Sequence, residues 1–118
     1  MNKVRSCLEA VSITDTARNK EALLAACFTK REMEKIQDGK LETIGGNLAA
    51  KRAVKKVLGM GGVSDFAPQS IEIGRSNNGA VEVLVHGYDN ADNALRVSIS
   101  HTKHTAYGLA VYQTGQDD

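Results

Sequence analysis

The chain has 118 residues and a formal net charge of +1, and 42% of its residues are hydrophobic but only 4% are aromatic. The length is typical of one domain, so we expect a single domain over residues 1–118 with an aliphatic core. The near-zero net charge argues neither for a nucleic-acid-binding protein nor for an acidic tail, so any cationic site has to be local. No apolar run approaches the roughly 20 residues of a membrane-spanning helix, and the N-terminus lacks the apolar stretch of a signal peptide. The chain has only two cysteines, for which reduced thiols are the expected state, and together these features predict a cytoplasmic protein.

The first predicted element is a strand over residues 4–13, VRSCLEAVSI. Its side chains alternate, so that Cys7, Val11 and Ile13 share one face with Glu9 among them. A buried carboxylate needs a charged partner, a metal ion or a proton. Glu9 is therefore a candidate site residue if this face is buried, and an ordinary solvated residue if it is not.

Two helices are predicted next. Residues 16–27, TARNKEALLAAC, are rich in helix-forming residues. Thr29 and Glu32 have the spacing of a capping box, and Phe28 is in position for a hydrophobic staple. The second helix is therefore expected to begin at Thr29 and to run to about Ile36.

A third helix is predicted over residues 47–58. Asn47 is a good N-cap residue, and Gly59 is a natural stop at the other end. Five aliphatic residues recur at helical spacing and predict one buried face: Ala50, Ala53, Val54, Val57 and Leu58. Loops are expected around three glycines that precede this helix: Gly39, Gly45 and Gly46.

Four cations lie within six residues of this helix: Lys51, Arg52, Lys55 and Lys56. They can form a solvated face, with the last two lysines at the negative end of the helix. Alternatively, several cations pair with the phosphate oxygens of a polyanion, and the glycines that follow let a ligand approach backbone N–H groups. The order of residues in a P-loop is absent, because here the glycines follow the helix. The residues alone leave both interpretations open.

The second half of the chain is predicted to be a meander of strands. Alternating patterns favour four strands: residues 70–75, 80–86, 96–100 and 107–112. Asn77-Asn78-Gly79 is a strong hairpin turn, residues 88–93 read as a second turn, and residues 113–118 read as a solvated tail. Helices followed by a meander of strands predict an α+β domain with an antiparallel sheet.

His101 lies between two of these strands in the segment SISHTKHT. It is either a polar residue that closes a strand, or a base or phosphate contact at the strand end. A nucleophilic dyad of Ser100 and His101 is disfavoured, because adjacent strand residues point to opposite faces. His101 and His104 are a poor zinc site, because no Cys or carboxylate lies at a useful spacing.

The order of these segments resembles the holo-acyl-carrier-protein synthase family, the short phosphopantetheinyl transferases. FT-x-x-E, LAAKRAVKKVLGMG, SIEI…NGAVEVLVHG and VSISHTKHTAYGLAV follow the family pattern over residues 28–112, and the match is weaker before residue 28. The resemblance implies a phosphopantetheinyl transferase-like fold, with an N-terminal strand and helices packed on an antiparallel sheet. It implies a transferase that moves 4′-phosphopantetheine from coenzyme A to a serine of an acyl carrier protein, in fatty acid or polyketide biosynthesis. It also implies a homotrimer with the coenzyme A site between subunits.

The resemblance assigns roles to particular residues. Lys51 and Lys56 match the two lysines of the family, Gly59 and Gly61 its Gly-x-Gly turn, and His101 its histidine beside the nucleotide. Lys51, Lys56 and His101 are thus the expected catalytic residues. The expected coenzyme A contacts are these residues and their neighbours: Lys51, Arg52, Lys55, Lys56, Gly59, Gly61, Ser100, His101 and Thr102.

The expected metal site departs from the family. The family binds Mg²⁺ with two carboxylates, one on the early strand and one directly after the first helix lysine. Glu9 is aligned with the first, but Arg52 replaces the second, and a guanidinium has no acceptor for a metal. We expect Arg52 to pair with Glu9 and fill the metal position, so that any activity depends weakly on Mg²⁺.

Two functions follow from this departure. The chain is either a divergent transferase, or a catalytically impaired family member that acts as an accessory subunit and binds a carrier protein or a nucleotide. A nucleic-acid-binding module is a remote third reading, because no stacking aromatic residues accompany the cations.

Overall fold

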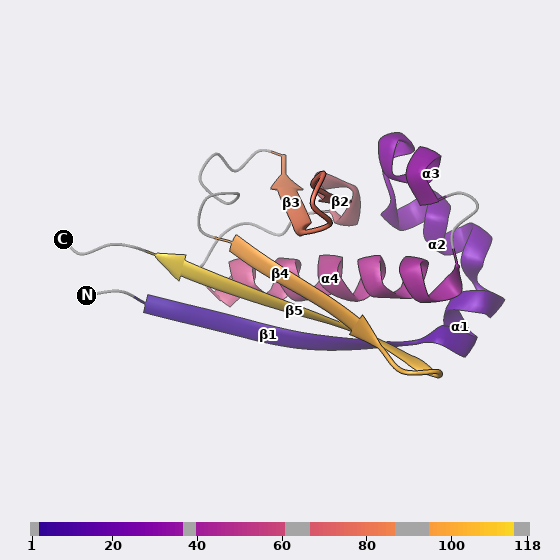
Figure 1. Cartoon of the computed structure of the whole chain (residues 1–118), viewed down its shortest axis with the longest axis horizontal. Coiled ribbons are helices and arrows are strands. Elements are labelled where there is room, and N and C mark those ends of the chain that lie inside the picture. The colour runs from indigo at the N-terminus through magenta and orange to yellow at the C-terminus, as the bar shows by residue number, and fades with distance from the viewer. Residues whose placement is uncertain (1–2, 37–39, 61–66, 87–94, 115–118) are drawn as a thin grey trace.

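The computed structural model describes residues 3–36, 40–60, 67–86 and 95–114 (Figure 1). The elements are, in chain order, β1 (Lys3–Ser12), α1 (Ile13–Arg18), α2 (Lys20–Cys27), α3 (Lys30–Ile36), α4 (Leu41–Met60), the short 3₁₀ helix η1 (Pro68–Ser70), β2 (Ile71–Arg75), β3 (Val81–Val85), β4 (Leu95–His101) and β5 (Thr105–Thr114). This α+β arrangement of helices on antiparallel strands confirms the predicted fold class. In the described part of the chain, no helix combines the length and apolarity needed to cross a bilayer.

The long helix α4 is the centre of the architecture. A three-stranded sheet of order β1-β5-β4 covers one side of α4, and the two-stranded sheet β2-β3 lies on its other side (Figure 1). Helices α1, α2 and α3 gather near the end of α4 where that helix begins (Figure 1). The helix is therefore enclosed by elements from both halves of the chain.

All strand pairs are antiparallel, and β5 is the central strand of the larger sheet. Strand β1 pairs along its whole length with β5, from Lys3 opposite Thr114 to Ser12 opposite Thr105. On the other side, β4 pairs with β5 and ends with His101 opposite Ala106. Glu9 and His101 thus lie on strands at opposite edges of this sheet.

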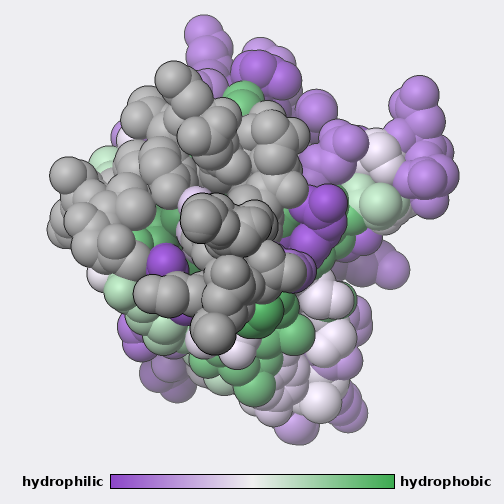
Figure 2. All heavy atoms as spheres, turned by 90° about the vertical axis from the view of Figure 1, so that its left-hand side faces the viewer, coloured by the Kyte–Doolittle hydropathy of each residue, from purple (hydrophilic) through white to green (hydrophobic). Residues whose placement is uncertain are grey.

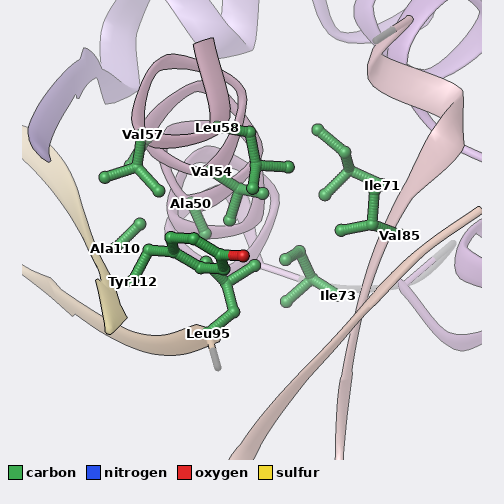
Figure 3. Packing of buried hydrophobic residues seen from close by; sticks show 11 residues of the cluster. Ala50, Val54, Val57, Leu58, Ile71, Ile73, Val85, Leu95, Ala110 and Tyr112 are labelled. Carbon is green, nitrogen blue, oxygen red and sulfur yellow. The ribbon is translucent and has the colours of Figure 1, made fainter. Parts of the chain in front are cut away.

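The core forms where α4 meets both sheets. One cluster joins the second half of α4 to β2, β3, β4 and β5 (Figure 3), and its members include Ala50, Val54, Val57, Leu58, Ile71, Ile73, Val85, Leu95, Ala110 and Tyr112. A second cluster packs the start of α4 against β1, α3 and the fully buried Phe28. The predicted aliphatic face of the helix is confirmed, because all five of its expected residues are completely buried.

Two predicted elements before α4 are also borne out, with shifted boundaries. The early strand is β1, and its inward face carries Cys7, Glu9 and Val11 as expected. The predicted helix over residues 16–27 is divided at Asn19 into α1 and α2, and α1 begins earlier because the Ser12 hydroxyl caps it by accepting from the Asp15 N–H.

The capping box before α3 is present. The Thr29 N–H donates to Glu32 Oε1 at 3.0 Å, and the Glu32 N–H donates to the Thr29 hydroxyl at 3.1 Å. The predicted strand pair around the Asn77–Gly79 turn corresponds to β2 and β3, and Gly79 has a positive φ of 87°. The predicted turn over residues 88–93 and the tail over 113–118 lie largely outside the described residues.

The predicted start of the third helix is wrong. Helix α4 begins at Leu41 and contains Gly45, Gly46 and Asn47, none of which ends or caps a helix. These glycines are there for close packing: a Cβ added to Gly46 would lie 2.5 Å from the Ile99 side chain. The helix also continues to Met60, so Gly59 belongs to its last turn. Gly39 and Gly61 lie outside the described residues.

Gly108 of β5 packs closely against the backbone of α4. A Cβ added at this position would lie 2.4 Å from the Ala50 backbone nitrogen, and a helix backbone cannot move aside as a flexible side chain can. We predict that Gly108→Ala lowers the free energy of unfolding by roughly 1–3 kcal/mol or more, as overpacking does. Urea denaturation measures the loss. Gly74→Ala is the matched control, because that glycine has no atom within 4 Å of the added Cβ; equal stability of the two variants would contradict the proposed cause.

Candidate functional site

A partly exposed ion pair joins β1 to α4. Glu9 comes from the inward face of β1, and Lys56 from the second half of α4, and Lys56 Nζ lies 2.8 Å from Glu9 Oε2. The Lys56 side chain is 61% exposed and that of Glu9 18% exposed, so solvent reaches the cation more than the anion. The hydrogen bond and charge of Glu9 raise the pKa of Lys56, so this lysine is cationic at neutral pH.

Cys7 lies beside this pair. Its Sγ donates to Glu9 Oε2 at 3.7 Å, a long contact that suits sulfur. Burial, together with the Glu9 carboxylate, raises the pKa of the Cys7 thiol. The thiol is therefore protonated at neutral pH and contributes a weak donor, not a nucleophile.

The expected pair between Arg52 and Glu9 is wrong, because Lys56 occupies that carboxylate instead. Side chains on an α-helix lean toward its N-terminus, so Lys56 covers the surface over the turn that carries Arg52. Arg52 is exposed, and within the described residues it forms no ion pair or hydrogen bond. The two cations are one helical turn apart, and the positive charge of Arg52 opposes the protonation of Lys56.

Lys51, another lysine predicted to contact coenzyme A, is not on this exposed surface. Its side chain is 1% exposed and points into the protein, where Nζ lies 2.6 Å from Glu32 Oε1. The ammonium also donates to the Pro68 carbonyl at 3.1 Å and to the Ile71 carbonyl. Three acceptors match the three N–H bonds of a charged lysine. Burial lowers the pKa of Lys51, and the bond to Glu32 opposes that shift.

Glu32 is the partner that the sequence did not identify. It was recognised as a helix cap, but it also accepts from the Ile73 N–H at 2.9 Å and binds Lys51. One buried carboxylate thus connects α3, α4 and β2. The available signal was weak: a capping glutamate is common, and its partner lies 19 positions later in the chain.

His101 stands apart from the Glu9–Lys56 pair. It is exposed at the end of β4, with Nδ1 3.1 Å from the Thr102 carbonyl oxygen. The Thr102 hydroxyl accepts from the N–H groups of His104 and Thr105, which fixes the short connection to β5. Ser100 is exposed on the opposite face of β4, so the disfavoured dyad with His101 does not form.

The remaining expected contacts fall into different places. Lys55 is half-buried on α4, and Gly59 has open space around it near the helix end. A separate cavity of about 640 Å³ lies between α3, β2 and β3, with Arg31, Glu72 and Arg75 among its lining residues. That cavity was not predicted, and none of the expected catalytic residues lines it.

The residues around Glu9 do not fit a Mg²⁺ ion. Mg²⁺ prefers near-octahedral oxygen ligands and usually one or two carboxylates. Here the Glu9 carboxylate is bound to an ammonium, and the adjacent helix position is the cation Arg52. Among the described residues, no group of three or more His, Cys, Asp or Glu side chains is placed to hold a metal. We therefore derive no step through a metal ion.

The curated proteins to which the chain is similar carry the same name. The chain is 35% identical over 118 residues to a holo-acyl-carrier-protein synthase of Clostridium perfringens strain SM101, which covers 90% of this chain and 88% of that protein. It is 35% identical over 98 residues to the protein of the same name from Oceanobacillus iheyensis, covering 80% of each chain. No family model matches the chain.

Solved structures share the fold. The Helicobacter pylori holo-acyl-carrier-protein synthase in complex with coenzyme A superposes with a TM-score of 0.73 at 25% identity, over 90% of this chain and 97% of that one. The Chronobacterium ammoniagenes ACPS–CoA complex gives a TM-score of 0.81 at 20% identity, over 97% and 99% of the two chains. At 20% identity, the comparison with the Chronobacterium ammoniagenes protein shows a shared fold only.

The buried Glu32–Lys51 pair makes a prediction about stability. Lys51→Met or Glu32→Gln alone leaves one buried charge without its partner, and each should lower the free energy of unfolding by about 3–5 kcal/mol. The double variant should lose much less than the sum of the two, because no buried charge is stranded. Urea denaturation of the wild type, the two single variants and the double variant measures the coupling between the two residues. Arg18→Met serves as control, since its pair with Asp15 is exposed and should be worth less than about 1 kcal/mol; strictly additive losses at the buried pair would contradict the prediction.

Proposed function

The chain belongs to the holo-acyl-carrier-protein synthase family, and on that premise we propose that it transfers 4′-phosphopantetheine from coenzyme A to a serine of an acyl carrier protein. The observation that carries the proposal is 35% identity to a holo-acyl-carrier-protein synthase over nine tenths of the chain. A fold shared with coenzyme A complexes of this family supports it. The chain is an enzyme, coenzyme A is its substrate and the carrier protein is its partner.

The reaction is a transfer at the diphosphate of coenzyme A. The serine oxygen forms a bond to the phosphorus that bears the pantetheine arm, the bond from that phosphorus to the bridging oxygen breaks, and adenosine 3′,5′-bisphosphate leaves. Negative charge builds up on the bridging oxygen, so cations and positioning should supply most of the catalysis. Lys56 is a candidate for this role, because it is exposed and cationic at neutral pH.

His101 is proposed to act at the nucleotide or as the acceptor of the serine proton. An exposed imidazole nitrogen can either donate to a phosphate oxygen or accept a proton. Within one chain, His101 and Glu9 lie on strands at opposite edges of the sheet, with β5 between them. We propose that two neighbouring copies contribute to one site, one with Lys56 and the other with His101.

The outer face of the larger sheet supports such an assembly. Val4 and Leu8 of β1 are each 62% exposed, and Leu109 of β5 is 37% exposed. Leu8 and Leu109 lie directly opposite each other in the strand pair, so they form one apolar strip on the side away from α4. Figure 2, seen from the side where β1 begins, shows hydrophobic surface at the level of this sheet. We propose that further copies of the chain cover the strip in a closed homotrimer.

We further propose that residues 1–118 form one domain and that the protein acts in the cytoplasm. The single domain is supported by the packing of both halves of the chain on α4. Free thiols at Cys7 and Cys27 are in keeping with a reducing compartment.

Transfer is tested by incubating the purified chain with coenzyme A and an apo-carrier protein. Mass spectrometry should show the carrier gaining one phosphopantetheine arm, and a carrier with its serine replaced by alanine should gain nothing. Lys56→Ala should lower kcat/KM by about 100-fold, a typical cost of removing one group that stabilises developing charge. If no apo-carrier is modified while coenzyme A still binds, the chain is an accessory subunit and not a transferase.

The assembly is tested by light scattering. The wild-type chain should have the mass of a trimer at micromolar concentration. Leu8→Asp places a charge in the apolar strip and should shift the protein toward monomer. Leu84→Asp is the control, because Leu84 is 40% exposed on β3, in the other sheet. A monomeric wild-type protein, or equal dissociation by both variants, would count against this interface.

A further inference from the structure

Three charged side chains meet where α4 passes β1. Glu9 and Lys56 form an ion pair of 2.8 Å, and Arg52 lies one turn before Lys56 on the same helix. Both cations are exposed, while Glu9 is largely shielded. The shielded carboxylate thus binds Lys56 from the protein side, and the charged groups of Arg52 and Lys56 are accessible to a ligand from solvent.

When no ligand is bound, the positive charges of Arg52 and Lys56 repel each other. Like charges at positions i and i+4 of a helix repel each other, and here the charge of Arg52 disfavours the charged form of Lys56. Glu9 can neutralise only one of the two cations, Lys56, and Arg52 forms no ion pair among the described residues. An anion with several oxygens would relieve it for both, because a guanidinium and an ammonium can each bind a phosphate oxygen.

The net charge of these three side chains bears on whether the site needs a divalent cation. Glu9 contributes one negative charge and Arg52 and Lys56 one positive charge each, so the three side chains carry one net positive charge. The cluster is thus already positive without a metal ion, so a diphosphate needs no divalent cation to be attracted to it.

We infer that the diphosphate of coenzyme A binds Arg52 and Lys56 directly, without a divalent cation, and that Glu9 is a positioning residue that anchors Lys56 instead of a metal ligand. This inference rests on the proposed function for the identity of the ligand. The ligand class is a diphosphate ester, and the contacts are the guanidinium edge of Arg52 and the two ammonium N–H bonds of Lys56 that Glu9 leaves free.

Calorimetry with coenzyme A tests the inference on the wild-type protein. Affinity measured in excess chelator should equal the affinity in millimolar Mg²⁺ within about twofold, which is well below the tenfold that corresponds to 1.4 kcal/mol. A titration of Mg²⁺ alone into the protein should give no saturable heat. Coenzyme A binding that tightens about tenfold or more with Mg²⁺ would overturn the inference.

The Arg52→Glu variant is the sharper test, because it introduces a second carboxylate near Glu9. It should lose about tenfold or more of its coenzyme A affinity in chelator, recover it when Mg²⁺ is added, and bind Mg²⁺ by itself. Arg18→Glu is the matched control, since Arg18 is 74% exposed on α1 and its reversal changes the net charge equally. An Arg52→Glu variant that binds coenzyme A as the wild type does in chelator would refute the role of Arg52.

Glu9→Gln separates anchoring from metal binding. An anchor predicts weaker coenzyme A binding by a similar factor with and without Mg²⁺, whereas a metal ligand predicts a loss that is confined to the Mg²⁺ condition. Circular dichroism confirms that the variant is folded. Failure of the proposed function is seen separately: a protein that binds coenzyme A in chelator but never modifies a carrier retains this site and lacks the transferase activity. A protein that binds no coenzyme A in either condition refutes the inference.

Discussion

The buried ion pair between Lys51 and Glu32 is the constraint on which the rest of this structure depends. Lys51 fixes α4 to the carbonyl groups at the start of β2, while Glu32 fixes the same helix to α3 and to the Ile73 N–H. A charge pair removed from water is stable only if every donor and acceptor finds a partner. The geometry satisfies this requirement, since no buried side-chain polar atom in the described residues lacks a hydrogen bond. The rotation of α4 about its own axis is therefore fixed by polar contacts as well as by apolar packing.

That rotation determines what the helix shows to solvent. With Lys51 turned inward, Arg52 one position later and Lys56 five positions later fall on exposed surface beside β1. The cations of this helix thus divide into an internal one that organises the fold and external ones available to a ligand. A run of basic residues that looks uniform in sequence therefore has two physical functions, and the burial of each side chain distinguishes them.

Local patterns in the sequence predicted the elements whose cause is local. The capping box at Thr29 and Glu32 and the aliphatic face of α4 depend on neighbouring residues, and both are present as predicted. The errors concern contacts between distant segments. Gly46 resembles a loop residue until Ile99 is seen against it, and Lys51 resembles an exposed cation until Glu32 is seen beneath it. Lys56 rather than Arg52 reaches Glu9 because of the lean of helical side chains, which spacing alone does not convey.

The close approach of Gly108 to α4 also determines how β5 aligns with its neighbours. A slip of β5 by one residue would turn its inward side chains outward, and burial of the core forbids that. A slip by two residues keeps the faces but brings Ala106 or Ala110 to the place where a Cβ would lie 2.4 Å from the Ala50 nitrogen. Both errors are therefore excluded, the first by hydrophobicity and the second by the absence of one methyl group. Because β5 is central, the alignment of β1 and β4, and with it the placement of Glu9 and His101, follows from this single glycine.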